Sequence, residues 1–144
     1  MTDLALQLIE ESEGCRLTAY KDTRGLWTIG VGHLLTQDRD WTGYAITQQE
    51  ADAFLSADST QARALAVEFP YFQSMNEVRQ AVCISMCFQM GSKPLSWPHF
   101  IQALHLQDYT SAAAAGLDSL WAVQTPVRAQ REMKMLESGA WVDA

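Results

Sequence analysis

Hydrophobic periodicity changes twice along this chain, from helical to strand spacing after Gly14 and back to helical spacing near residue 47, and this limits the folds open to it. In residues 27–32 bulky apolar residues alternate with small ones, which is the spacing of a β-strand. Residues 17–20 offer a partner strand. Residues 22–25 between them begin with Asp and end with Gly, as a type I turn prefers. The sequence therefore predicts one β-hairpin in a chain that is otherwise helical.

Helices are predicted at both ends of the chain. The first has Thr2 or Asp3 as its N-cap and Gly14 as its C-terminal stop. Its apolar residues recur at helical spacing: Leu4, Ala5, Leu8 and Ile9. The last helix begins at Thr125-Pro126, which supplies an N-cap and a proline at the first helical position.

The long middle of the chain is also predicted to be helical. A capping box over residues 47–50 opens a helix to about Phe69, and a proline follows. Asn76 caps a second helix through Met90. This helix is apolar on most sides and is therefore expected at the centre of the protein. Shorter helices are predicted over residues 100–106 and 110–121.

Composition narrows the classes of function. The 144 residues, 48% of them hydrophobic, suit one globular domain, and a net charge of −7 argues against binding nucleic acid. Neither a signal peptide nor the roughly 20 apolar residues of a membrane span is found, so no stable membrane association is expected. An odd number of cysteines (Cys15, Cys83 and Cys87) indicates a reduced, cytosolic product. No metal-ligand cluster stands out.

Two carboxylates beside the predicted hairpin have opposite surroundings. Glu13 closes the first helix, where the negative end of the helix dipole and the neighbouring Glu10 and Glu11 favour its protonated form. Asp22 opens a turn, where backbone N–H groups commonly bond an aspartate and favour its ionised form. A proton donor and an anion on either side of a chain reversal are typical of general acid–base chemistry in one cleft.

The second strand of the hairpin adds a candidate surface for a ligand. Thr28, Gly30 and Gly32 alternate onto one face of the strand. A face of one threonine and two glycines packs poorly but lets a ligand approach the backbone closely. The opposite face carries the residues expected in the core: Trp27, Ile29 and Val31.

Residues 13–33 read EGCRLTAYKDTRGLWTIGVGH. This segment resembles the signature of the T-even phage lysozymes, glycoside hydrolase family 24, whose pattern is E-G-x-R-L-x-x-Y-x-D-x-x-G-x-x-T-I-G-x-G-H. Every fixed position is filled. The likeness extends to residues 34–36, 88–91 and 124–126, and to a Gly-x-Trp at residues 139–141. It therefore covers nearly the whole chain.

The resemblance implies a lysozyme that hydrolyses the β-1,4 bond between N-acetylmuramic acid and N-acetylglucosamine in peptidoglycan, without metal or cofactor. Glu13 falls on the general acid of the family, Asp22 on its second catalytic carboxylate and Thr28 on its third active-site residue. With an oxocarbenium-like transition state, Asp22 and Thr28 would hold a water against the sugar face opposite Glu13. The family's behaviour suggests inversion of the anomeric carbon.

Five further positions carry over from the family. Arg128 matches the residue that pairs with the catalytic glutamate, which would offset part of the preference for a protonated Glu13. His33 and Asp58 match an ion pair that we interpret as structural. Leu34 and Phe88 match positions that line the saccharide cleft.

Two differences from the family bear on the substrate. Phe100 and Ala115 replace polar cleft residues, so some sugar contacts must differ. The segment at residues 37–46 is shorter than its counterpart in the family. That counterpart forms a wall of the cleft, so the difference bears on substrate length and on tolerance of peptide crosslinks.

The sequence thus predicts an α+β, mainly helical, lysozyme-like fold in one domain, residues 1–144. Its two lobes are a small β-containing lobe at about 13–58 and a helical lobe made of 1–12 and 59–144. We expect an endolysin made in the host bacterial cytoplasm. Because no export signal is found, we expect a holin to release it to the periplasm and cell wall, and a monomer is the default expectation. Two alternatives are a lytic transglycosylase and a non-catalytic wall-binding or tail structural protein, and the complete set of Glu13, Asp22 and Thr28 argues against both.

Overall fold

The computed structural model describes residues 3–144, and Thr2, the alternative N-cap, lies outside this range. Helix α1 (Leu4–Glu13) begins at Asp3, whose carboxylate accepts hydrogen bonds from two backbone N–H groups of the first turn. The helix ends at Gly14, as predicted, where a φ of 76° turns the chain toward the sheet.

An antiparallel sheet of three strands follows α1. Its strands are β1 (Arg16–Lys21), β2 (Trp27–Gly30) and β3 (His33–Leu34), in that spatial order. The predicted hairpin corresponds to β1 and β2, whereas β3 was not predicted. The loop that follows pairs with the free edge of β1 through a single bridge between Thr18 and Ala45. Both edges of the short hairpin are therefore covered.

Two long helices follow the sheet. Helix α2 (Gln48–Ala66) begins with the predicted capping box at Thr47 and ends before the predicted Phe69. Helix α3 (Glu77–Met90) begins at the predicted cap Asn76. Its residues 81–87 are all buried, which confirms its predicted central position. Short 3-10 turns follow each helix, at Phe72–Ser74 and Lys93–Ser96.

Four helices complete the chain: α4 (Pro98–His105), α5 (Tyr109–Leu117), α6 (Leu120–Gln124) and α7 (Pro126–Ser138). The single helix predicted over residues 110–121 is wrong. Ser119 divides it, because its hydroxyl donates to the Gly116 carbonyl at 2.6 Å and accepts from the Ala122 N–H at 3.4 Å. A side chain that bonds its own backbone in this way ends one helix and caps the next.

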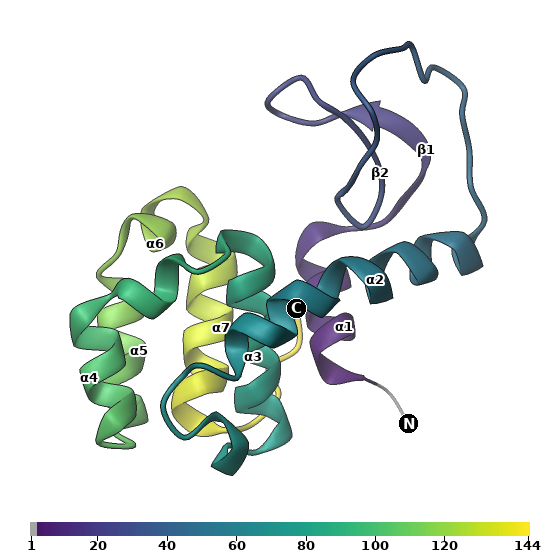
Figure 1. The fold of residues 1–144 in the computed structure, drawn as a ribbon. Coiled ribbons are helices and arrows are strands. Elements are labelled where there is room, and N and C mark those ends of the chain that lie inside the picture. The colour runs from purple at the N-terminus through teal and green to yellow at the C-terminus, as the bar shows by residue number, and fades with distance from the viewer. Residues whose placement is uncertain (1–2) are drawn as a thin grey trace.

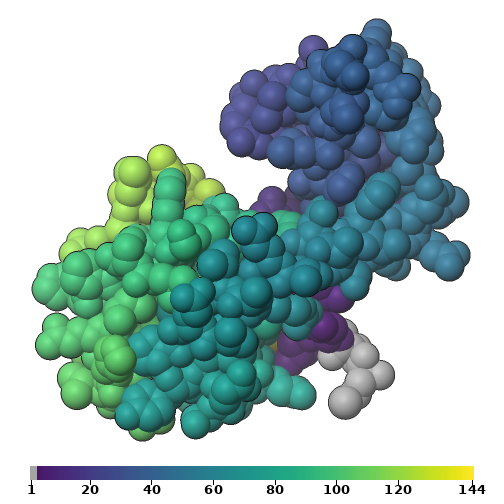
Figure 2. All heavy atoms as spheres, in the orientation of Figure 1, coloured from purple at the N-terminus to yellow at the C-terminus, as the bar shows by residue number. Residues whose placement is uncertain are grey.

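The sheet lies at one end of the molecule and helices α3–α7 at the other, with α2 running between them (Figure 1). Figure 2 shows the sheet part projecting from the helical part, with the surface hollowed between them. The sequence boundary at residue 58 falls inside α2, which continues through it. Along residues 3–144, no helix combines the length and the apolar character needed to cross a bilayer.

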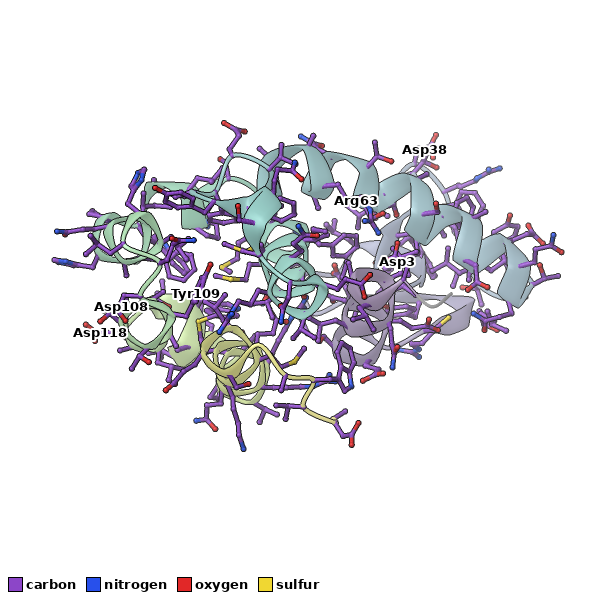
Figure 3. The ribbon with its side chains drawn as sticks, turned by 90° about the horizontal axis from the view of Figure 1, so that it is seen from below. Asp3, Asp38, Arg63, Asp108, Tyr109 and Asp118 are labelled. Carbon is purple, nitrogen blue, oxygen red and sulfur yellow. The ribbon has the colours of Figure 1, made fainter. Side chains whose placement is uncertain are left out.

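Two clusters of buried residues hold these parts together. The larger is centred on α3, which packs against α1, α2 and α7, and includes Leu8, Met86 and Met133 with no exposed surface. The smaller joins the sheet to α2 through Ile29 and Ala51. An ion pair adds to the contact of α1 with α2, since Arg63 reaches Asp3 at 2.6 Å (Figure 3). The three cysteines are free.

The prediction that one face of β2 is open to a ligand is wrong. Thr28 is only 3% exposed, and Gly30 is buried against α2, where an added Cβ would lie 3.5 Å from the Cβ of Ala51. The φ of 64° at Gly30 also ends the strand, so Gly32 does not continue the alternation. Gly30 therefore allows α2 to pack closely against β2. Trp27, expected in the core, is half-buried beneath the ammonium of Lys21.

Candidate active site

Glu13 lies where the helical part of the molecule meets the sheet. It is the last residue of α1, and its side chain is 29% exposed. Arg128 from α7 donates from Nη1 to Oε1 of Glu13 at 2.6 Å. On the other side, a Cβ added at Gly32 would lie 4.0 Å from Oε2, so the turn between β2 and β3 passes beside this carboxylate. Arg128 thus holds Glu13 on one side, and part of the Glu13 side chain remains exposed to solvent.

Asp22 is held as an anion by the turn that it opens. The Leu26 N–H donates to its Oδ1 at 3.0 Å, and Arg24 donates from its backbone at 2.8 Å and from its guanidinium at 3.1 Å. The Leu26 bond first, and the Arg24 bonds after it, hold the pKa of Asp22 below its usual value. This is the charge state that its turn position predicts.

Tyr20 lies within electrostatic reach of both carboxylates. Burial raises the pKa of its phenol, and Glu13 and Asp22 both add to the increase against the opposing effect of Arg16. Tyr20 is also the register partner of Thr28 across the β1–β2 pair. Asp22 and Thr28 therefore lie near the turn of the hairpin, and Tyr20 interacts electrostatically with both Glu13 and Asp22.

The hydroxyl of Thr28 is already used as a donor. Its Oγ1 donates to the Leu26 carbonyl at 2.9 Å, which fixes the rotamer and leaves the oxygen lone pairs as acceptors. Leu26 thereby connects two site residues, because its N–H bonds Asp22 and its carbonyl bonds Thr28.

A buried polar network stands behind Glu13. Arg128 also donates from Nε to Glu132 at 2.9 Å and from Nη2 to the hydroxyl of Ser85 at 3.0 Å. Burial opposes the charge of Arg128, but Glu132 and Glu13 outweigh it and raise its pKa. Glu132 and Ser85 were missed from the sequence. The available signal was the spacing of four residues between Arg128 and Glu132 in a predicted helix.

His33 and Asp58 connect the sheet to α2. Nδ1 of His33 lies 2.8 Å from Oδ2 of Asp58, and the imidazole stacks on the ring of Phe54 at 4.1 Å between centroids. These contacts position β3 against the helix, which suits the structural role expected for the pair.

The two expected cleft residues lie in different surroundings. Leu34 is 50% exposed at the end of the sheet. Phe88 is half-buried beside a hollow of about 210 Å³ whose lining includes Asp58 and Gly91 but not Leu34.

The two sequence differences from the family, at Phe100 with Ala115 and at residues 37–46, border two separate hollows. Phe100 is 1% exposed, with its ring against Phe69 and Trp97, and lines with Ala115 a mostly apolar cavity of about 480 Å³. The short segment at 37–46 borders an open hollow of about 600 Å³ near the sheet. Among residues 3–144, no three His, Cys, Asp or Glu side chains gather as a metal site would need.

Comparison with known proteins gives one consistent result. The family model described as phage lysozyme matches residues 10–134. The Probable T4-type lysozyme 1 of Dictyostelium discoideum is 26% identical over 92% of each chain. The endolysin of Acyrthosiphon pisum secondary endosymbiont phage 1 is 33% identical over 79% of this chain and 75% of the relative. The pre-baseplate central spike protein Gp5 of Enterobacteria phage T4 is 30% identical over 92% of this chain, which spans 27% of that protein.

Proposed function

Because the chain belongs to the phage lysozyme family and is a lysozyme-type peptidoglycan hydrolase, we propose that Glu13 is its general acid and Asp22 its second catalytic carboxylate. The bond cleaved is the β-1,4 bond between N-acetylmuramic acid and N-acetylglucosamine. The observation that supports this most directly is the difference between the partners of the two carboxylates: Asp22 accepts hydrogen bonds from N–H groups of its own turn, whereas Glu13 accepts from Arg128 of a distant helix on one oxygen and has its other oxygen toward Gly32.

Glu13 donates its proton to the glycosidic oxygen as the bond breaks. One of its oxygens accepts from Arg128, and the other lies toward the turn at Gly32, on the side of the sheet. Arg128 thus fixes the orientation of the carboxyl group, which a proton donor needs in order to lie within hydrogen-bond reach of the oxygen that it protonates.

Asp22 stabilises the positive charge that develops on the sugar ring and accepts a proton from the attacking water. Thr28 contributes through its lone pairs, since its proton is already given to the Leu26 carbonyl. Water attacks the face opposite the leaving group, so the product has the inverted anomeric configuration. Asp22 and Thr28 reach the same water from adjoining parts of the hairpin.

The endolysin relatives favour a biological setting for the same activity. In this setting the enzyme is made in the host cytoplasm, acts as a monomer and reaches the wall through a holin. Co-expression with and without a holin, followed by cell density, tests the route of access. Sedimentation of the purified chain tests the monomer.

Digestion of purified peptidoglycan tests the function itself. The proposal expects muropeptides that end in reducing N-acetylmuramic acid, identified by mass spectrometry after borohydride reduction. A 1,6-anhydro product would instead identify a lytic transglycosylase. Absence of any cleavage would favour a structural tail protein, a candidate raised by the spike protein relative.

A further inference from the structure

Glu132 is a carboxylate inside the hydrophobic core. It lies on the inner face of α7 with no exposed surface, next to the equally buried Met133 and one turn after Ala129. Burying a carboxylate is costly unless it is paired and hydrogen-bonded. The proposed mechanism gives Glu132 no part, so its presence needs another explanation.

The hydrogen bonds that the Glu132 side chain accepts converge on one oxygen. Oε2 accepts from Nε of Arg128 and from the hydroxyl of Ser85, each at 2.9 Å. Oε1 is buried and has no hydrogen-bond partner within residues 3–144. The carboxylate is therefore aimed at Arg128 and Ser85, although this leaves its second oxygen unpaired.

Arg128 is held on three sides at once. Its Nε bonds Glu132, its Nη2 bonds Ser85 and its Nη1 bonds Glu13 at 2.6 Å. The guanidinium is planar, so fixing Nε and Nη2 in the interior also fixes the direction of Nη1. Glu132 thus acts on the position of Glu13 through one rigid group.

We propose that Glu132 is a positioning residue that fixes Arg128 against Glu13 and balances part of the guanidinium charge. This inference rests on the proposed role of Glu13 as the general acid. Arg128 alone would orient Glu13 but would also favour loss of its proton, which an acid must keep. With Glu132 behind it, Arg128 keeps the orienting bond while its charge is shared between two carboxylates.

Other charged and titratable groups surround this network. Arg131 of α7 and the Cys83 thiol of α3 interact electrostatically with Glu132, and Tyr20 of β1 interacts with Glu13. Burial raises the pKa of Glu132, and Arg128 opposes that increase. The balancing effect therefore operates above the raised pKa of Glu132 and disappears at lower pH.

The test is Glu132→Gln, which keeps an acceptor for Arg128 but removes the negative charge. Because Glu132 does not touch substrate, kcat falls several-fold while KM stays within about a factor of two. The uncompensated Arg128 moves the alkaline limb of the pH–activity profile toward lower pH. Glu137 is an exposed glutamate on the same helix, so Glu137→Gln is the matched control. It leaves kcat and the alkaline limb unchanged.

Two further measurements keep the proposal falsifiable. The carbon-13 chemical shift of the Glu13 carboxyl, which needs no activity, changes in Glu132→Gln because the bond from Arg128 is no longer fixed. If that variant does not fold, Glu132→Asp serves instead. It retains the charge but withdraws the carboxylate from Arg128, so kcat falls and the alkaline limb stays in place.

A Glu132→Gln variant with unchanged kcat and an unchanged Glu13 carboxyl chemical shift would overturn the inference, as would movement of the alkaline limb of the activity profile toward higher pH. Wild-type kcat in Glu132→Asp would overturn the positioning role. Failure of the proposed function is seen separately, as an unsubstituted protein that releases no reducing ends or a Glu13→Gln variant that remains active.

Discussion

Single residues set the charges in this site. Glu13 and Asp22 are both carboxylates at the ends of short elements, but Asp22 is surrounded by N–H donors and Glu13 by one shared guanidinium. An acid and a base can coexist at one pH when their surroundings separate them in this way. Arg24 and Arg128 are therefore two of the side chains through which the pH range of activity can be adjusted.

Arg24→Ala tests the control of the Asp22 charge. In the folded protein the pKa of Asp22 lies below its usual value, so the ionised form needed for catalysis is lost only as pH falls through that lowered value. Removing the Arg24 side chain raises the pKa of Asp22 part of the way, because the backbone bonds remain. The acid limb of the kcat/KM profile moves to higher pH.

Arg39→Ala is the control for that experiment, because it removes one positive charge from an arginine stacked on Trp41. Its acid limb stays at the position of the unsubstituted enzyme. An acid limb that is the same in Arg24→Ala and Arg39→Ala would show that Arg24 does not govern the charge of Asp22.

Residues with local signals could be predicted from the sequence, and residues defined by distant packing could not. Glu13, Asp22 and Thr28 lie within one short signature and were identified together. Glu132 was not, because its significance depends on α7 meeting α1 and α3, far apart in the chain. Its position inside an apolar helix face gave only a weak signal.

Helices and strands divide in the same way as single residues, into those with local signals and those that depend on other contacts. The caps at Asp3, Thr47 and Asn76 form as predicted, because each depends on a few neighbouring residues. Strand β3 and the break at Ser119 were not predicted. The first depends on pairing with β2 and the second on side-chain bonds that compete with the helix.

Gly116 tests the packing of α5 on α7. An added Cβ would overlap the sulfur of the fully buried Met133, so Gly116→Ala lowers the free energy of unfolding by about 1–3 kcal/mol even though alanine favours helix. Thermal or urea unfolding measures the change. In a Met133→Ala background the same substitution becomes neutral or stabilising, and an equal loss in both backgrounds would rule out the steric explanation.

The whole molecule carries its charge unevenly. Of the net charge of −7, residues 1–60 hold −6 and residues 61–144 hold −1. The acidic half supplies Glu13 and Asp22, whereas Arg128 and Arg131 come from the nearly neutral half. A protein charged in this way is repelled at long range by a wall that carries carboxylates of its own.

Ionic strength tests that consequence. Repulsion between like charges is least screened at low salt, so the rate of wall lysis falls as salt is removed. Turbidity of isolated walls, followed from about 10 to 150 mM salt, spans Debye lengths of roughly 30 to 8 Å. A rate that rises steadily as salt is removed would contradict the expectation.

Lysis of outer-membrane-permeabilised Gram-negative cells tests the role of Glu13 most directly. Glu13→Gln keeps the size of the side chain and an acceptor for Arg128 but cannot donate the proton, so turbidity should fall at a rate reduced by at least about 100-fold. Glu10→Gln, a glutamate one turn earlier on α1, is the matched control and should lyse the cells at nearly the unsubstituted rate. Equal lysis by Glu13→Gln and the unsubstituted protein would contradict the mechanism.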